Sequence, residues 1–170
     1  MDIEIQRACD AQDAPDDQRL RDFACMALEG LRAPVVCLRI VDEQEMAELN
    51  GRWRQRAYAT NVLSFPGAIP PGLPDEECPD LLGDVVLCAP VIAAEAQAQR
   101  KPLEAHWAHM IIHGLLHLRG HDHIQQDDAE VMEALERRLL AALGFPDPYA
   151  DPADHPSQPT WLQRGDERRS

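Results

Sequence analysis

The sequence predicts an α+β domain in which a small, mostly four-stranded sheet packs against about five helices. Four short runs, either rich in β-branched residues or alternating between polar and apolar residues, have the pattern of strands. Longer segments between and after them carry apolar residues every three or four positions, which is typical of helices that bury one face. So few strands, each close to a helix, favour one helix-covered sheet. The length of 170 residues suits one such domain.

Strand and helix patterns alternate in the first half of the chain. DIEIQ (2–6) alternates in polarity as a half-buried strand does, and the β-branched run VVCLRIV (35–41) indicates a second strand. Between them, an amphipathic helix is predicted from six apolar residues at helical spacing: Leu20, Phe23, Ala24, Ala27, Leu28 and Leu31. Asp42, with Glu45 three positions later, can cap a further helix.

The second half begins with strands and continues as helices. NVLSF (61–65) and GDVVLCA (83–89) are the third and fourth strand candidates. The stretch between them is predicted to be a loop because it contains five prolines: Pro66, Pro70, Pro71, Pro74 and Pro79. Pro90 suits the first turn of the next helix, and helical patterns continue to Leu143, where Gly144 can end the last helix.

We expect residues 1–147 to form the domain and residues 148–170, rich in proline and charge, to form a flexible tail. The net charge of −14 argues against a protein that binds nucleic acid through a broad basic face. Five cysteines without a C-x-x-C pair indicate reduced thiols, as in a cytoplasmic protein. Residues 1–10 lack the pattern of a signal peptide, and no apolar run approaches the roughly 20 residues that would span a membrane.

Six of the seven histidines fall between His106 and His123, and three of them fit H-x-x-x-H-x-x-G-x-x-H. His113 and His117 lie four positions apart, so on a helix both can point at one metal ion. Gly120 can end this helix in a left-handed conformation and let the chain return His123 as a third ligand. Three histidine ligands leave one position open, which is the layout of a catalytic zinc site.

The ligand spacing matches that of the metzincin metalloproteases, but the chemistry differs at one position. The glutamate that serves those enzymes as general base is replaced by Gly114. Peptide hydrolysis by the usual route is therefore not expected. His109 shares the helical face of His113, and we interpret it as a core histidine rather than as a partner of a metal ligand.

A second group of candidate residues lies in RWRQRAYATNVLSFP (52–66). Arg52, Arg54 and Arg56 could bind an anionic substrate through forked hydrogen bonds to phosphate, or they could pair with the many carboxylates of the chain. Ser64 is a candidate substrate-binding residue if its strand borders a cleft, and otherwise a residue of the sheet edge.

Several of these stretches together resemble the YbeY family of bacterial endoribonucleases. The resemblance rests on VDEQEMAELNGRWR, ATNVLSFP, LLGDVVLC, HWAHMIIHGLLHLRGHDH and LGFPDPY, which follow one another from about residue 35 to residue 150. The chain departs from the family pattern at His121, where the family typically has tyrosine.

The resemblance implies a cytoplasmic, zinc-dependent endoribonuclease specific for single-stranded RNA. It implies a role in maturation of ribosomal RNA, notably the 3′ end of the small-subunit RNA, and in ribosome quality control. By motif position, His113, His117 and His123 would bind one Zn²⁺ ion, and Arg54 would contact the scissile phosphate as a catalytic and substrate-binding residue. Family analogy adds ribosomal proteins or an assembly GTPase as partners.

Three questions stay open at the level of sequence. Either water or the 2′-hydroxyl of the RNA could attack the phosphate, and with Gly114 in place of glutamate no general base is identified. A peptidase that recruits its base from elsewhere is one alternative. A ribosome-assembly factor with a structural zinc is another, and it would bind RNA without turnover.

Overall fold

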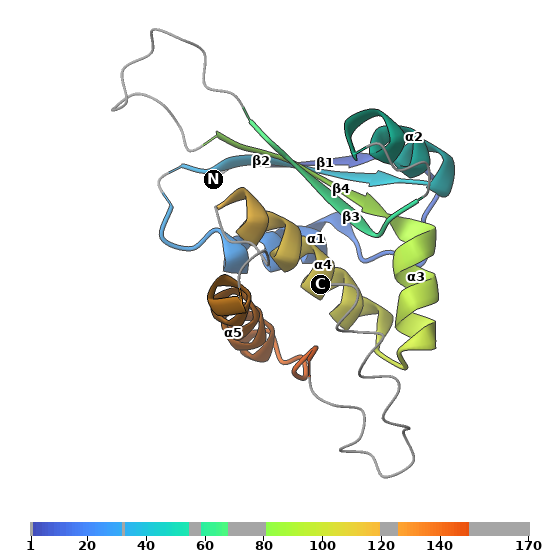
Figure 1. The fold of residues 1–170 in the computed structure, drawn as a ribbon. Coiled ribbons are helices and arrows are strands. Elements are labelled where there is room, and N and C mark those ends of the chain that lie inside the picture. Colours follow the sequence, from blue (N-terminus) through green and yellow to red (C-terminus); the bar gives the residue numbers. More distant parts are fainter. Residues whose placement is uncertain (1, 32, 55–58, 68–80, 120–125, 150–170) are drawn as a thin grey trace, which may run out of the picture.

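The computed structural model describes residues 2–31, 33–54, 59–67, 81–119 and 126–149. Strands and helices alternate at first, and three helices follow the last strand (Figure 1). The elements are β1 (Asp2–Arg7), α1 (Asp17–Ala27), β2 (Val35–Val41), α2 (Glu43–Arg54), β3 (Val62–Pro66), β4 (Leu81–Cys88), α3 (Ala89–Ala98), α4 (Leu103–Leu118) and α5 (Gln126–Ala142).

The four strands form one mixed sheet in the order β1-β2-β4-β3. The first three run parallel, with Ile5 beside Leu38 and Leu38 beside Val85. Strand β3 runs antiparallel to β4, with Ser64 opposite Val85. The chain passes from β1 to β2 through α1, and from β2 to β4 through α2 and β3, because parallel strands need long connections.

The main core lies between the sheet and the layer formed by α1 and α4 (Figure 1). Helix α4 is central to it, because it contacts α1, α3 and α5 as well as strands β3 and β4. Its side chains Trp107, Ile111, Ile112 and Leu115 are almost completely buried. The apolar character of this helix nearly all round follows from its position between the sheet and other helices.

The opposite face of the sheet is covered at one end by α2 (Figure 1). Met46 of α2 packs there on Leu63, Val86 and Cys88. Successive residues of β4 therefore point to opposite faces, with Val85 in the main core and Val86 in this smaller one. Helices α4 and α2, which both carry predicted site residues, therefore lie on opposite sides of the sheet.

The predicted fold class is confirmed, since the described residues form four strands and five helices. Asp16 caps α1 by accepting a hydrogen bond from the backbone N–H of Arg19 at 2.8 Å. Helix α1 ends at Ala27, so Leu31, the last of the apolar residues at helical spacing, lies beyond it. In the part of the chain that the structure describes, no helix combines the length and apolar character needed to cross a membrane.

The end of the described chain packs on the domain. Lys101 Nζ donates to the carbonyl of Pro148 at 3.0 Å, and the Tyr149 hydroxyl donates to Glu136 at 2.9 Å. Pro148 and Tyr149 lie just past the predicted domain limit at 147, and the domain bounds themselves stay a prediction. The rest of the predicted tail, 150–170, falls outside the described residues.

Candidate metal centre

Three histidines form a stripe along one face of α4. His109, His113 and His117 succeed one another at four-residue steps, with ring centroids 6.1 and 4.6 Å apart. His109 is buried, while His113 and His117 are half-buried. The helical spacing that the motif predicts is therefore present, and the stripe runs from the interior of the domain toward its surface.

The His113 and His117 rings face each other through their Nε2 atoms, which lie 3.1 Å apart. Two imidazole nitrogens bound to one tetrahedral zinc at about 2.0–2.1 Å would lie about 3.3 Å apart. The observed separation is close to this value without any change in the backbone. By their donor type and by this geometry, the two residues fit a shared metal ion.

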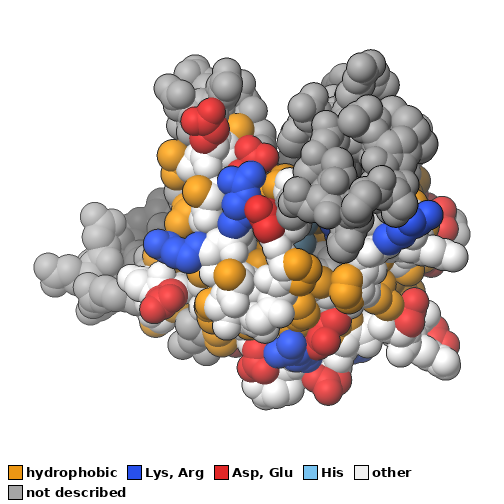
Figure 2. Space-filling view, turned by 90° about the horizontal axis from the view of Figure 1, so that it is seen from below, with side chains coloured by type: hydrophobic (Ala, Val, Ile, Leu, Met, Phe, Trp, Pro, Cys, Tyr) orange, Lys and Arg blue, Asp and Glu red, His pale blue; other side chains and the backbone are white. Residues whose placement is uncertain are grey.

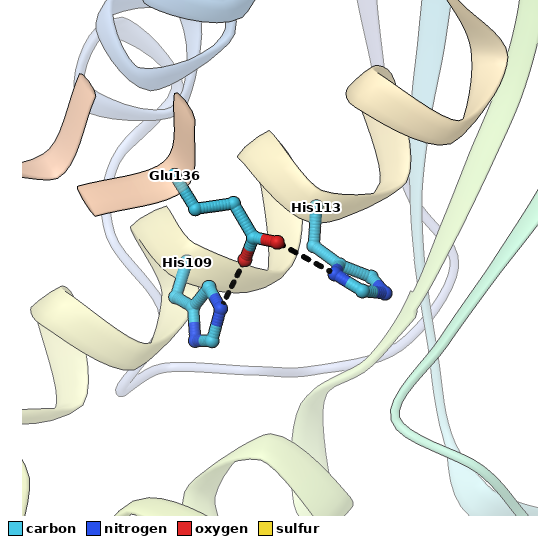
Figure 3. A group of neighbouring side chains, drawn as sticks. All are labelled: His109, His113 and Glu136. Carbon is cyan, nitrogen blue, oxygen red and sulfur yellow. Dashed lines mark hydrogen bonds and ion pairs between the residues drawn. The ribbon is translucent and has the colours of Figure 1, made fainter. Parts of the chain in front are cut away.

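A buried glutamate approaches the stripe from α5. Figure 3 shows Glu136 between His109 and His113, with one carboxylate oxygen directed at each ring. Its Oε1 lies 3.4 Å from His113 Nδ1, and its Oε2 accepts hydrogen bonds from His109 Nε2 and from the Tyr149 hydroxyl. Glu136 is completely buried, so three side chains replace the water it loses on folding.

The hydrogen bonds keep this buried carboxylate ionised. Burial on its own raises the pKa of Glu136, but hydrogen bonds from His109 and His113 outweigh it and bring the pKa well below its usual range. Burial lowers the pKa of His109, with the nearby carboxylate opposing the shift, so His109 is neutral. Burial, followed by the negative charge of Glu136, raises the pKa of Tyr149, which therefore keeps its proton and donates it.

These residues offer two arrangements for a metal ion. His109, His113 and Glu136 each present one ligand atom, and these atoms all lie within 4.8 Å of one another, so this cluster could hold an ion. The His113–His117 pair offers the second arrangement, on the other side of the His113 ring. In the second arrangement Glu136 contacts the nitrogen of His113 that faces away from His117, as carboxylates do behind many metal-bound histidines.

Gly114 brings α4 against the sheet directly beside His113. A Cβ atom at this position would lie 2.7 Å from Val85 Cγ1 and 3.2 Å from Ser64 Oγ. The Ser64 hydroxyl donates to the Gly114 carbonyl at 2.9 Å and so ties β3 to the helix. The position that carries glutamate in metzincins thus faces the sheet here, with no room for a side chain.

The remaining predicted residues are only partly described. Arg54 is the last residue of α2, on the sheet face opposite α4, and its side chain and all of His123 fall outside the described residues. Their predicted roles stay predictions, as does a contact between Ser64 and substrate. Asn61, which precedes β3, donates to Glu95 of α3 at 3.1 Å.

The sequence reasoning missed Glu136 and Tyr149, and it treated His109 only as a core residue. The signal for Glu136 was present, since this glutamate interrupts an apolar stripe that includes Met132 and Leu140. A carboxylate at such a position needs a buried partner, and His109 is a suitable donor. Nothing local in LGFPDPY indicates that Tyr149 reaches the same carboxylate.

Comparisons with known proteins identify the family to which the chain is similar. The family described as Endoribonuclease YbeY matches residues 14–144. An Endoribonuclease YbeY of Pseudomonas entomophila is 55% identical over 152 residues, covering 89% of this chain and 94% of the relative. Another, of Alcanivorax borkumensis, is 52% identical and covers 92% of this chain and 90% of the relative.

A solved structure supports the fold. The solution structure of a Thermotoga maritima protein covers 84% of this chain and 91% of its own, with 24% identity and a TM-score of 0.50. At this identity the likeness concerns the fold alone. The family match, together with relatives at more than half identity over most of their length, shows that the chain belongs to the endoribonuclease YbeY family.

Proposed function

We propose that this protein is a zinc-dependent endoribonuclease that cleaves single-stranded RNA. In the cell it would act in the cytoplasm, in maturation of the 3′ end of small-subunit ribosomal RNA and in ribosome quality control. The observation that carries the proposal is the His113–His117 pair, with Nε2 atoms 3.1 Å apart, in a member of a family named for endoribonuclease activity.

We assign His113, His117 and His123 as the zinc ligands. The alternative cluster of His109, His113 and Glu136 is less suited, because both oxygens of Glu136 already accept hydrogen bonds from His109, His113 and Tyr149. As a ligand through Nε2, His109 would give up its hydrogen bond to Glu136 and carry its ring proton on the buried Nδ1, which has no hydrogen-bond partner among the described residues. The motif spacing supports His123 as the third ligand, which leaves an open coordination position.

A zinc ion held there supplies Lewis-acid chemistry at a phosphodiester. The protein side chains would hold the metal ligands in place and bind the anionic substrate. Arg54, by its place before the TNVLSF element, would stabilise negative charge that develops on the phosphate. Attack by the 2′-hydroxyl would leave a 2′,3′-cyclic phosphate and a 5′-hydroxyl, whereas attack by water would give no cyclic product.

The packing at Gly114 supports a nuclease over a peptidase. A metzincin-type peptidase needs a carboxylate beside the first histidine. Here that position is Gly114, where an added Cβ atom would lie 2.7 Å from Val85 Cγ1. Asp84 does not replace this carboxylate, because it is exposed and precedes Val85, so its side chain points to the opposite face of the sheet from α4.

The charge of the chain bears on how RNA would be bound. On the face drawn in Figure 2, Lys and Arg side chains are interspersed with Asp and Glu rather than gathered in one basic patch. With a net charge of −14, long-range attraction to RNA is not expected. We therefore include ribosomal proteins or an assembly GTPase among the proposed partners, as carriers that deliver the substrate.

The test compares wild-type protein with His117→Ala, using His155→Ala as a control histidine outside the ligand set. Bound metals are quantified by elemental analysis, and each protein is incubated with a labelled single-stranded RNA and with casein. We expect about one zinc per wild-type and control chain, little in His117→Ala, and RNA cleavage only where zinc is bound. End-group analysis of the products identifies the attacking group.

Each contrary result points to a different conclusion. Zinc retained by His117→Ala would overturn the ligand assignment and favour the cluster that includes Glu136. Zinc bound by wild type with intact RNA would favour the assembly-factor alternative, and casein cleavage without RNA cleavage would favour a peptidase.

A further inference from the structure

We propose that Glu136 is a positioning residue that fixes the tautomer of His113, so that the lone pair of Nε2 faces His117. The inference rests on the proposed metal site, but not on the identity of the substrate. Glu136 belongs to α5, 23 positions after His113, and is completely buried. Its carboxylate is the point at which α4, α5 and the segment after α5 meet.

The donors around this carboxylate dictate where the protons lie. An ionised carboxylate only accepts hydrogen bonds, so each nitrogen or hydroxyl that contacts it must carry a proton. His113 therefore donates through Nδ1–H, and a neutral imidazole with a proton on Nδ1 has its lone pair on Nε2. That Nε2 is the atom 3.1 Å from His117 Nε2.

The other two donors hold the carboxylate in place. His109 donates through Nε2–H, and its buried Nδ1 has no hydrogen-bond partner among the described residues, as suits a nitrogen without a proton. Tyr149 donates its hydroxyl proton to the same oxygen at 2.9 Å, and its ring packs edge-on against His109, with centroids 5.3 Å apart. With Oε2 held by two donors, Oε1 is turned toward His113.

Replacing this carboxylate by an amide makes a sharp prediction. In Glu136→Gln, the amide oxygen keeps two hydrogen bonds if it takes the Oε2 position, facing His109 and Tyr149. The reverse orientation would push a proton onto the buried Nδ1 of His109, where no partner is described. With the amide oxygen at the Oε2 position, the amide NH₂ faces His113 Nδ1. This nitrogen can accept a hydrogen bond only if the ring proton of His113 moves to Nε2. The lone pair directed at His117 is lost.

The experiment uses metal-free protein near pH 8, where imidazoles are mostly neutral, and two-bond ¹H–¹⁵N correlation spectra that distinguish protonated from bare ring nitrogens. His113 signals are identified by their loss in His113→Gln. We expect the proton on Nδ1 in wild type and on Nε2 in Glu136→Gln. Zinc affinity, measured by competition with a chelating dye, should fall about 10–100-fold in Glu136→Gln.

Two further variants distinguish a positioning role of Glu136 from an effect of its charge and from an effect on folding. Glu130→Gln removes an equal charge from an exposed site on α5 and should leave tautomer and zinc affinity unchanged. Tyr149→Phe keeps the carboxylate and removes one of its donors, so His113 should keep its tautomer and zinc affinity should fall less than in Glu136→Gln. Circular dichroism confirms that each variant is folded.

A proton on Nε2 of His113 in wild type would overturn the inference, even if Glu136→Gln fails to fold. So would a folded Glu136→Gln with an unchanged tautomer and zinc affinity. None of these measurements uses RNA, so they can fail while the nuclease proposal stands. Likewise, absence of RNA cleavage would leave the tautomer result untouched.

Discussion

At the scale of single residues, Gly114 and Ser64 show how closely the histidine helix approaches the sheet. Glycine usually weakens a helix interior by about 1 kcal/mol relative to alanine. At Gly114 this preference is overridden, because an added Cβ would meet Val85, a completely buried core residue of β4. The close approach also brings the Ser64 hydroxyl within 2.9 Å of the Gly114 carbonyl.

Gly114→Ala should therefore lower the free energy of unfolding by about 1–3 kcal/mol, as overpacking of a core does. Urea unfolding monitored by circular dichroism measures the change. A more stable variant would show that the helix shifts easily and that the higher helix propensity of alanine decides the sign of the change in stability. Since Gly114 is adjacent to His113, we also expect weaker zinc binding if the helix moves away from the sheet.

Ser64→Ala should lower the free energy of unfolding by about 1 kcal/mol through loss of the hydrogen bond to Gly114. The same variant tests the predicted substrate contact. If that contact exists, KM for RNA rises in Ser64→Ala, and the change persists at temperatures far below the unfolding transition. An unchanged KM together with lower stability would restrict Ser64 to the structural role.

At the scale of elements, the candidate site depends on how α4 is held at its end. Arg119 follows α4 directly and precedes residues 120–125, which include His123. Its Nη1 donates to the carbonyl of Ala27 at 2.8 Å and to that of Glu29 at 3.1 Å. A cation at these carbonyls is favourable because the C-terminal end of α1 carries partial negative charge.

Arg119→Gln should lower the free energy of unfolding by about 1 kcal/mol, the small value reflecting the exposure of this side chain to solvent. Thermal and urea unfolding provide the measurement. Arg138→Gln, at an exposed arginine of α5, is the matched control and should be nearly neutral. Equal effects of the two variants would assign the loss to net charge instead of to the contact with α1.

For the molecule as a whole, one partly buried thiol and one buried thiol couple stability to alkaline pH. Burial and, next, the charge of Asp84 raise the pKa of Cys37 from 9.0 to about 11. Burial raises the pKa of Cys88 to about 11 as well, partly opposed by a backbone hydrogen bond from Val91. Between about pH 9 and 11 the unfolded chain therefore loses thiol protons that the folded chain keeps.

Stability should be at its full value below pH 9 and should decrease as the pH rises toward 11, since the unfolded state binds fewer protons in that range. Urea unfolding at several pH values measures the slope. Cys88→Ala removes one of the thiols whose pKa is raised, so its stability, compared with its own value at pH 8, should decrease less steeply than that of wild type. Identical slopes would exclude Cys88 as a source.

Much of the fold could be predicted because its signals are local. The alternating pattern of 2–6 and the β-branched run 35–41 coincide with β1 and β2 to within one residue, because each strand buries a defined face. The predicted end of the last helix at Gly144 is close to the observed end of α5 at Ala142. Sheet order could not be predicted, since it depends on contacts between distant segments.

The fold class and the pairing of His113 with His117 follow from local sequence patterns, because a four-residue step on a helix places both rings on one face. The residues that contact this pair from other elements depend on the packing of the whole chain. Glu136 and Tyr149 reach His109 and His113 through the packing of α5 and of the segment after it on α4, over separations of 23 to 40 positions. No local periodicity encodes such contacts. They arise because a buried carboxylate must find its donors wherever the folded chain places them.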